Sequence, residues 1–278
     1  MKNRIRSRVK ALIPPAHRPR LRRLMTRVKY FGWRYQCPIC HSHLRRLLPF
    51  GLRLRVLTDH QVVGGGYRPN AQCPVCHCVD RERLLYVYLS TQTNLFSERT
   101  KLLHVAPEGR LRGILETRAN LDYVAADLTS PKAIVKMDIT EIPYPANTFD
   151  VVICNHVLEH IIDDRRAMRE LHRVLKPGAW GILQVPISSS LKTTYEDASV
   201  KSPAAREKAF GQSDHVRIYA DDYSTRLQES GFEVQPFRWW KNDRHFGGRR
   251  NRFALLPGEK VFVVTKEADE KSQERRVG

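Results

Sequence analysis

The feature that most constrains the fold is the stretch 149–160, which reads FDVVICNHVLEH. Its apolar run at 151–154 predicts a central parallel strand buried on both faces, because a half-exposed strand would alternate polar and apolar residues. In open parallel sheets, ligands bind outside the carboxyl ends of the strands. The polar residues that follow the run therefore mark a candidate site: Asn155, His156, Glu159 and His160. The alternative is that they form a satisfied turn with a helix cap.

Between residues 100 and 266, apolar runs typical of strands alternate with helical patterns. Helices are expected from residue 109 to about 118, from Asp163 to the Pro177-Gly178 stop, and over 221–230 with Gly231 at the end. This alternation predicts an α/β fold with a parallel sheet and right-handed crossovers. The seven expected strands are 101–106, 121–126, 133–137, 149–154, 180–185, 232–237 and 260–265.

Four runs in this region carry a family resemblance: LLHVAPEG, YVAADL, VKMDITEIPYPANTFDVVICNHVLEHI and RELHRVLKPGAWGILQVPI. They resemble class I S-adenosylmethionine-dependent methyltransferases of the broad type 11 group, over roughly residues 100–266. The resemblance implies a Rossmann-like seven-stranded methyltransferase sheet and S-adenosylmethionine as the cofactor.

The resemblance also implies which residues hold that cofactor. Asp127, at the end of the second strand, would bind the ribose hydroxyls with Leu128 beside it, and Asp138, at the end of the third, would bind the adenine amino group. Ile139 would pack on the adenine ring, and Asn155 would lie at the end of the fourth strand. A lone Asp at the end of a strand is more often a helix cap. The binding role is nevertheless physically sound, because each charge-assisted hydrogen bond that such a carboxylate accepts from the cofactor contributes about 1.5 to 3 kcal/mol.

The first loop departs from the family pattern, which is an acidic residue followed by glycines. His104 replaces the acid, and Ala106-Pro107-Glu108-Gly109 replaces most of the glycines. Gly109 still permits an unusual backbone dihedral, and Ala106 has a small side chain. We expect Ala106, Glu108 and Gly109 to contact the cofactor, with Glu108 meeting its methionine ammonium group.

Two CPxC motifs, Cys37–Cys40 and Cys73–Cys76, predict a small zinc-ribbon-like module. Two thiolates three positions apart reach one tetrahedral ion, and the second pair closes its coordination, so the metal is expected to be structural. Redox chemistry is the rival for a single CxxC motif, but repetition favours zinc. The neighbouring residues His41, His43, His77 and Cys78 complicate the choice, and the predicted ligands are Cys37, Cys40, Cys73 and Cys76.

Other patterns complete the module. LRLRVL, from Leu52, alternates like a half-exposed strand, and Gly64-Gly65-Gly66 marks a flexible turn. From Asp80 the pattern changes to that of a helix entering the large domain. Cys154 lies in the apolar strand and is expected to be inert core.

The amino-terminal part is strongly basic. Sixteen Lys and Arg residues occur up to Arg55 and no Asp or Glu precedes Asp59, so this part carries most of the formal net charge of +19. Leu21, Leu24, Val28 and Phe31 repeat with helical spacing, which predicts a basic amphipathic helix. Two alternatives remain for this helix. Its apolar face docks on the main domain, or its basic residues bind an anionic surface, which would consist of RNA phosphates or acidic lipid headgroups.

The expected organisation is a basic arm at 1–35, the zinc module at 36–90, a methyltransferase domain at 91–268 and a disordered tail at 269–278. The sequence has no apolar run of about 20 residues that would span a bilayer, and its start lacks the apolar core of a secretory signal. A cytoplasmic protein is predicted, with peripheral membrane contact as an alternative.

Methyl transfer requires alignment above all, and a base only where the acceptor must lose a proton. His156 is the first candidate base, because imidazole titrates near neutral pH. Asp214-His215 offers a second acid-base pair in the long segment 188–219, in which Tyr195, Arg217 and Tyr219 are further substrate-side candidates. Glu159 and His160 are expected to support the loop.

Three functions fit these observations. The first is methyl transfer to a small-molecule, sugar or lipid-linked acceptor, since the long segment suits an enclosed substrate and no base-stacking platform is visible. The second is methylation of ribosomal or transfer RNA, because a zinc module ahead of such a domain resembles a bacterial ribosomal-RNA guanine methyltransferase family. The third is a non-catalytic zinc-ribbon docking protein.

Overall fold

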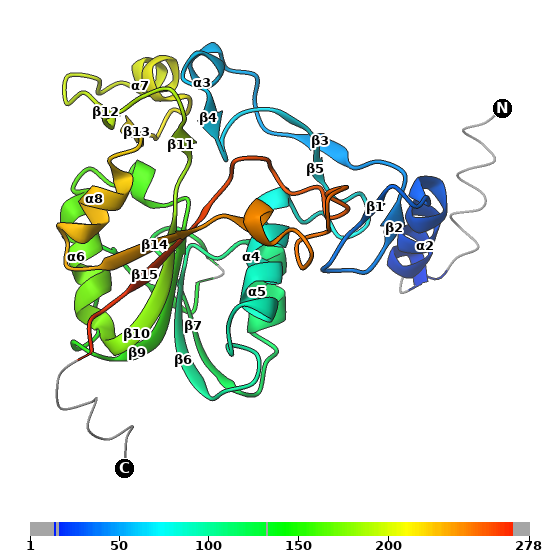
Figure 1. Ribbon diagram of the computed structural model, residues 1–278, viewed down its shortest axis with the longest axis horizontal. Helices are drawn as coiled ribbons and strands as arrows, with labels where there is room; N and C mark the ends of the chain where they lie inside the picture. The colour runs from blue at the N-terminus through cyan, green and yellow to red at the C-terminus, as the bar shows by residue number, and fades with distance from the viewer. Residues whose placement is uncertain (1–13, 15–16, 132, 269–278) are drawn as a thin grey trace.

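A twisted seven-stranded sheet forms the centre of the computed structural model, which describes residues 14, 17–131 and 133–268 (Figure 1). The strand order is β14-β15-β10-β9-β6-β7-β8, and β15 alone runs antiparallel to its neighbours. This confirms the predicted α/β sheet. The strands are β6 (Thr100–Val105), β7 (Leu121–Asp127), β8 (Val135–Lys136), β9 (Phe149–Asn155), β10 (Leu175–Gln184), β14 (Glu233–Phe237) and β15 (Val261–Thr265).

Helices cover both faces of the sheet, as Figure 1 shows. Successive side chains of a strand point to opposite faces, so Val152 and Cys154 pack in one core while Val151 and Ile153 pack in the other. This two-sided burial explains the continuous apolar run in β9. On the first face lie α6 (Asp164–Val174) and α8 (Tyr223–Gln228); on the second lie α4 (Asp80–Thr91), α5 (Gly109–Leu115) and the 3-10 helix η3 (Trp239–Asn242).

Between residues 17 and 79, the part of the chain described ahead of α4 contains two small antiparallel strand pairs and two helices. One part of it differs from the sequence prediction: the expected strand at Leu52 is wrong, because residues Arg55–Asp59 form the helix α3. This helix buries Leu57 against Gly66 and against Gly211, far along the chain, so tertiary packing overrides the local alternation. The elements are α2 (Arg18–Tyr30), β1 (Tyr35–Gln36), β2 (His43–Leu44), β3 (Leu48–Phe50), α3 and β5 (Arg68–Gln72), with β1 pairing β2 and β3 pairing β5.

We call residues 187–219 the lid. It consists of β11 (Ile187–Ser188), β12 (Tyr195–Glu196), α7 (Pro203–Phe210) and β13 (Arg217–Ile218). Two elements from the amino-terminal part lie against it (Figure 1): β4 (Val62–Val63) pairs with β11, and α3 contacts α7. The cover of the sheet's carboxyl edge is therefore built from two segments more than 100 residues apart in the sequence.

Hydrogen bonds and ion pairs of two buried arginines hold the lid to the main domain. Arg217 donates to the carbonyls of Leu158 and Ile162, both at 2.9 Å, and pairs with Glu196 at 2.9 Å. Arg226, in α8, pairs with Asp164 at 2.8 Å and also with Glu196. Arg217 and Tyr219, expected on the substrate side, are buried in this network, which fixes the lid over the loop that follows β9.

The helix α2 confirms the predicted amphipathic segment but not its docking on the main domain. No residue of α2 is buried, and Leu24 and Val28 are 57% and 72% exposed. Its carboxyl end is attached to the cysteine-containing part, where Arg45 donates its backbone N–H to the carbonyl of Tyr30 at 2.8 Å. Residues 1–13 of the arm and the expected tail at 269–278 lie outside the described residues.

Candidate functional site

The turn after β6 provides the first side of the candidate site. Ala106 has a φ of +44°, a left-handed conformation that is strained for a residue with a side chain, and space is open around Gly109. The Glu108 carboxylate lies 3.5 Å from His104 Nε2 and 3.7 Å from Arg81 Nε. Burial by itself raises the pKa of Glu108, but the neighbouring His104 and Arg81 side chains outweigh it and lower that pKa.

Two carboxylates follow the neighbouring strands. Asp127 Oδ1 accepts the backbone N–H groups of Thr129 and Ser130, both at 2.8 Å, and Asp138 Oδ1 accepts the N–H and the hydroxyl of Thr140 at 2.8 Å. These bonds orient both carboxylates in their turns. Leu128, after Asp127, is half exposed, whereas Ile139, after Asp138, is buried in the core.

Polar groups at the end of β9 are buried without protein partners. Asn155 is 3% exposed, and neither its amide oxygen nor its amide nitrogen has a hydrogen-bond partner among the described residues. His156 has a φ of +54° and donates its backbone N–H to the carbonyl of Gln184 at 2.7 Å. Unpaired buried polar groups are costly, about 1 to 3 kcal/mol each, so the arrangement suits a site that a ligand completes.

Glu159 connects the two candidate bases. Its Oε1 lies 3.3 Å from His156 Nδ1, and one carboxylate oxygen of Glu159, one ring nitrogen of His160 and one of His215 lie within 4.8 Å of one another. His160 Nδ1 lies 3.1 Å from Asp214 Oδ2. Burial first, then the charge of Arg81, lowers the pKa of His156, so the neutral imidazole is favoured.

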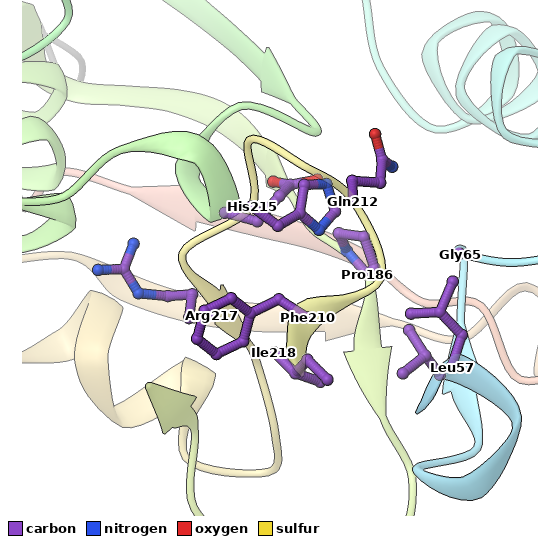
Figure 2. Close-up of a pocket in the computed structure, with 10 residues that line it drawn as sticks. Leu57, Gly65, Pro186, Phe210, Gln212, His215, Arg217 and Ile218 are labelled. Atoms are coloured by element: carbon purple, nitrogen blue, oxygen red, sulfur yellow. The ribbon is translucent and has the colours of Figure 1, made fainter. Parts of the chain in front are cut away.

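A pocket adjoins these groups, and Figure 2 shows how its residues come from different segments. Pro186 follows β10; Phe210, Gln212, His215 and Ile218 belong to the lid; and Leu57 and Gly65 come from the amino-terminal part. Val62, Glu159 and Arg217 complete its lining. The structure thus places His215 next to Glu159. A backbone hydrogen bond from the N–H of Val216 to the carbonyl of Glu159, at 2.9 Å, holds the two segments together.

Sequence reasoning missed four contributors to this site. Arg81 lies near Glu108, and a Cβ added to Gly64 would lie 3.6 Å from His156 Cε1 and 3.5 Å from Glu259 Oε1. Gln184 Nε2 donates to Glu259 Oε1 at 3.2 Å. The glycine run is a visible signal, although by itself it indicates only a flexible turn. Glu259 and Arg81 carry no local pattern that distinguishes them from surface charges.

The cysteines form one sulfur cluster that includes a residue outside the predicted set. Cys37 Sγ lies 3.6 Å from Cys76 Sγ and 3.5 Å from Cys78 Sγ, and Cys40 Sγ lies 3.8 Å from Cys73 Sγ. The four sulfurs within 4.8 Å of one another are those of Cys37, Cys73, Cys76 and Cys78, so Cys78 replaces Cys40 in that quartet. Cys154 is buried in the sheet core.

The two CPxC motifs have matching backbone geometry. His41 and His77 donate their N–H groups to the carbonyls of Cys37 and Cys73, at 2.8 and 2.9 Å, and both have positive φ. Cys37 and Cys73 in turn donate their own N–H groups to the carbonyls of Ser42 and Cys78, at 3.0 and 2.9 Å. Cys78 therefore occupies in the second turn the position that Ser42 occupies in the first.

Residues 103–183 match the methyltransferase domain family, which confirms the resemblance over that stretch. The 27-O-demethylrifamycin SV methyltransferase of Amycolatopsis mediterranei (strain S699) is 27% identical over 157 residues, 53% of this chain and 56% of that protein. Ubiquinone/menaquinone biosynthesis C-methyltransferase UbiE of Escherichia coli O1:K1 / APEC is 30% identical over 129 residues, 41% of this chain and 46% of that protein. The chain thus spans about half the length of these relatives.

Among solved structures, the Burkholderia thailandensis 1,6-didemethyltoxoflavin-N1-methyltransferase, with 1,6-didemethyltoxoflavin and S-adenosylhomocysteine bound, is 16% identical to this chain. The alignment covers 67% of this chain and 76% of that one, with a TM-score of 0.43. In the part of the chain that the structure describes, no helix is long and apolar enough to cross a membrane.

Glu259 generates a prediction about pH. Burial first, then the charge of Asp80, raises its pKa to about 8. An unfolded Glu titrates near pH 4.3, so between that pH and 8 the native state holds a proton that the unfolded state has lost, and stability falls as pH rises. Between those two pH values the group lowers the free energy of unfolding by about 1.4 kcal/mol for each unit that the pH rises. We expect Glu259→Gln, which does not titrate, to remove this contribution.

Urea unfolding from pH 5 to pH 8 measures the effect, with Glu98→Gln, at an exposed site, as the control. Parallel stability curves for Glu259→Gln and the parent would contradict the prediction.

Proposed function

We propose that the chain is an S-adenosylmethionine-dependent methyltransferase acting on a small-molecule, sugar or lipid-linked acceptor. The proposal starts from the match of residues 103–183 to the methyltransferase domain family. The observation that carries the proposal is the set of buried, unpartnered polar atoms at the carboxyl edge of the sheet, on Asn155, His156 and Glu159. They lie under the lid, at the same carboxyl edge of the sheet as the two strand-end carboxylates that the family resemblance assigns to the cofactor.

The residues present fit the cofactor. Asp127 and Asp138 offer oriented carboxylates for the ribose hydroxyls and the adenine amino group, and the open space at Gly109 admits a ligand close to the backbone. Glu108 suits the methionine ammonium group. Arg81, which faces Glu108, suits the methionine carboxylate, so a cation from α4 compensates for the loop's lost glycines.

The cofactor supplies a methyl group already activated by its sulfonium, so the protein's task is to orient the acceptor and exclude water. His156 is placed to accept a proton, because Glu159 receives its Nδ1–H and leaves Nε2, which is buried and has no described partner, as the basic nitrogen. The lid, which Arg217 holds over the loop that follows β9, favours a small acceptor over a duplex. The name of the rifamycin relative, a 27-O-demethylrifamycin SV methyltransferase, is consistent with a hydroxyl acceptor.

The central test measures cofactor affinity and turnover separately. We expect Asp127→Asn, which keeps the turn's acceptor oxygen but removes the charge, to weaken S-adenosylmethionine binding about tenfold in calorimetry, the equivalent of about 1.4 kcal/mol. Asp122→Asn, at an exposed residue of the same strand, should bind normally. His156→Ala should lower turnover far more than binding.

Acceptors for the turnover assay come from small-molecule, lipid and RNA extracts, with transfer of the labelled methyl group as the readout. Absence of cofactor binding by the parent protein would favour the non-catalytic docking function. Equal turnover in His156→Ala would remove this residue from catalysis.

We also propose that α2 places the protein on an anionic lipid surface. Arg and Lys residues flank a stripe of exposed apolar side chains, and beyond the helix Phe31 and Trp33 are 54% and 73% exposed. Each cation contributes about 1 kcal/mol near an anionic leaflet. Aliphatic side chains gain free energy in the acyl region and gain little on RNA, so Leu24, Met25 and Val28 favour lipid over nucleic acid.

Vesicle sedimentation tests this placement. The full-length protein should bind phosphatidylglycerol-containing vesicles and bind pure phosphatidylcholine weakly. The double variant Leu24→Gln, Val28→Gln keeps the charge and should bind the anionic vesicles about tenfold more weakly or worse, because it removes apolar burial. Ile162→Gln, at a residue 79% exposed elsewhere, serves as the control. Unchanged binding of the double variant, with salt-sensitive binding to RNA, would favour the RNA alternative.

The cysteine cluster, we propose, binds one structural zinc ion through Cys37, Cys40, Cys73 and Cys76. The support is the matching geometry of the two CPxC turns, in which Cys78 is the counterpart of Ser42 and so lies outside the tetrahedral set. Four thiolates form a closed site that contributes on the order of 10 kcal/mol to folding. Cys78, which is fully buried, would then support the site.

Cobalt substitution distinguishes the possible ligand sets, because thiolate ligands give strong near-ultraviolet charge-transfer absorption. Cys78→Ser should keep this absorption, since serine already occupies the equivalent position 42. Cys73→Ser should lose most of it. Loss in Cys78→Ser with retention in Cys40→Ser would instead select the quartet of Cys37, Cys73, Cys76 and Cys78.

A further inference from the structure

A second group of metal-binding side chains lies on the acceptor side of the sheet, away from the thiols. We propose that Glu159, His160 and His215 bind a divalent transition-metal cation there, and that this cation binds the acceptor oxygen. One ligand atom from each residue lies within 4.8 Å of the other two, which is the spacing that a single ion requires. The role in catalysis rests on the proposed methyltransferase function; the binding site itself does not.

The ligand atoms are available and poorly satisfied by the protein. Glu159 uses Oε1 toward His156, while Oε2 is buried and has no hydrogen-bond partner among the described residues. His215 Nε2 is buried and unpartnered in the same sense. Glu159 is 2% exposed and His215 is 5% exposed. Burying a carboxylate and an imidazole without hydrogen-bond partners costs free energy, and a bound cation would pair with both.

The surroundings orient the third ligand as metal sites commonly do. His160 Nδ1 lies 3.1 Å from Asp214 Oδ2, which leaves Nε2 as the nitrogen available to a metal. A carboxylate that binds the second nitrogen of a metal-bound histidine fixes its tautomer and raises its basicity. The rings of His160 and His215 meet edge to face with centroids 4.5 Å apart, so the two imidazoles lie together beside Glu159.

The ligand types select the class of metal. Two imidazoles and one carboxylate suit zinc and related transition metals, and three protein ligands leave coordination positions for water or substrate. Figure 2 shows His215 beside the pocket that Pro186 and Phe210 line, so an open position would face the space expected for the acceptor. The site therefore has the character of a catalytic site, in contrast to the closed thiolate cluster.

A cation in this position would act on a hydroxyl acceptor. Coordination lowers the pKa of the hydroxyl, whose proton passes to His156 and then to solvent. The oxygen forms a bond to the methyl carbon as the bond from that carbon to sulfur breaks, which leaves neutral S-adenosylhomocysteine. His215, expected from the sequence to be a base, would then be a ligand.

Metal content provides the test. The full-length protein is equilibrated with excess Zn²⁺, passed through a desalting column and analysed for zinc per chain. We expect two equivalents in the parent and one in His160→Ala, which changes a partly exposed residue and so leaves folding intact. His245→Ala, at an exposed histidine, should keep two. Asp214→Asn should weaken the second equivalent by about 10- to 100-fold.

Cobalt added to protein that holds only one equivalent of zinc, which fills the all-thiolate site first, provides a second readout. Binding at a nitrogen and oxygen site gives visible d–d absorption without the thiolate charge-transfer band, and His160→Ala should abolish it. A zinc content that is the same in His160→Ala as in the parent would overturn the proposal. Two equivalents without methyl transfer to any acceptor would sustain the metal site and count against the proposed function.

Discussion

In-register pairing of the parallel strands determines where the chemistry of this protein lies. Val105 pairs with both Ala126 and Cys154, and Cys154 pairs with Leu183, so four strands end in one row. The residues that follow each strand must then meet at one edge. This brings Glu108, Asp127 and His156 together, although they are widely spaced in the sequence. Burial of the sheet on both faces holds the row in place, because a shift of one residue would exchange the side chains of the two cores.

The cysteine-containing part is joined to this edge by polar contacts from α4. Glu82 accepts the backbone N–H groups of Arg110 and Leu111 at the start of α5, at 2.9 and 3.3 Å. Arg83 is fully buried and donates to the carbonyls of Ala71, Phe253 and Ala254. Loss of order around the thiols would therefore reach both the turn that follows β6 and the segment before β15.

The sheet and most of its helices were predictable from the sequence, because their signals are periodic and local. The run in β9 and the acids after β7 and β8 are each apparent from a few neighbouring residues. The helix that was predicted to run to Pro177-Gly178 ends instead at Val174, and those two residues lie in β10. Asp214-His215 was likewise visible as a pair, although its proximity to Glu159 was not. The third strand was predicted over 133–137 but consists only of Val135–Lys136.

The remaining features depend on contacts between distant parts of the chain, for which local patterns give no signal. Leu57 packs on Gly211, and Val63 pairs with Ile187, so α3 and β4 are determined by the lid. Glu259 is a buried acid in a stretch that resembles an ordinary surface loop. For α2, the local pattern does predict the apolar stripe of the helix. It does not show whether another part of the protein covers that stripe, so its exposure was not predictable.

The pairing of β4 with β11 has a consequence for dissecting the protein. A fragment beginning near residue 91 would lose α4 from one face but retain every strand of the central sheet. It would nevertheless lack Gly64 and Leu57, which pack beside His156 and against the lid. Solvent would then reach the imidazole and Glu159 directly. An inactive catalytic fragment would thus be the expected outcome of cutting at the apparent domain boundary, even if the fragment folds.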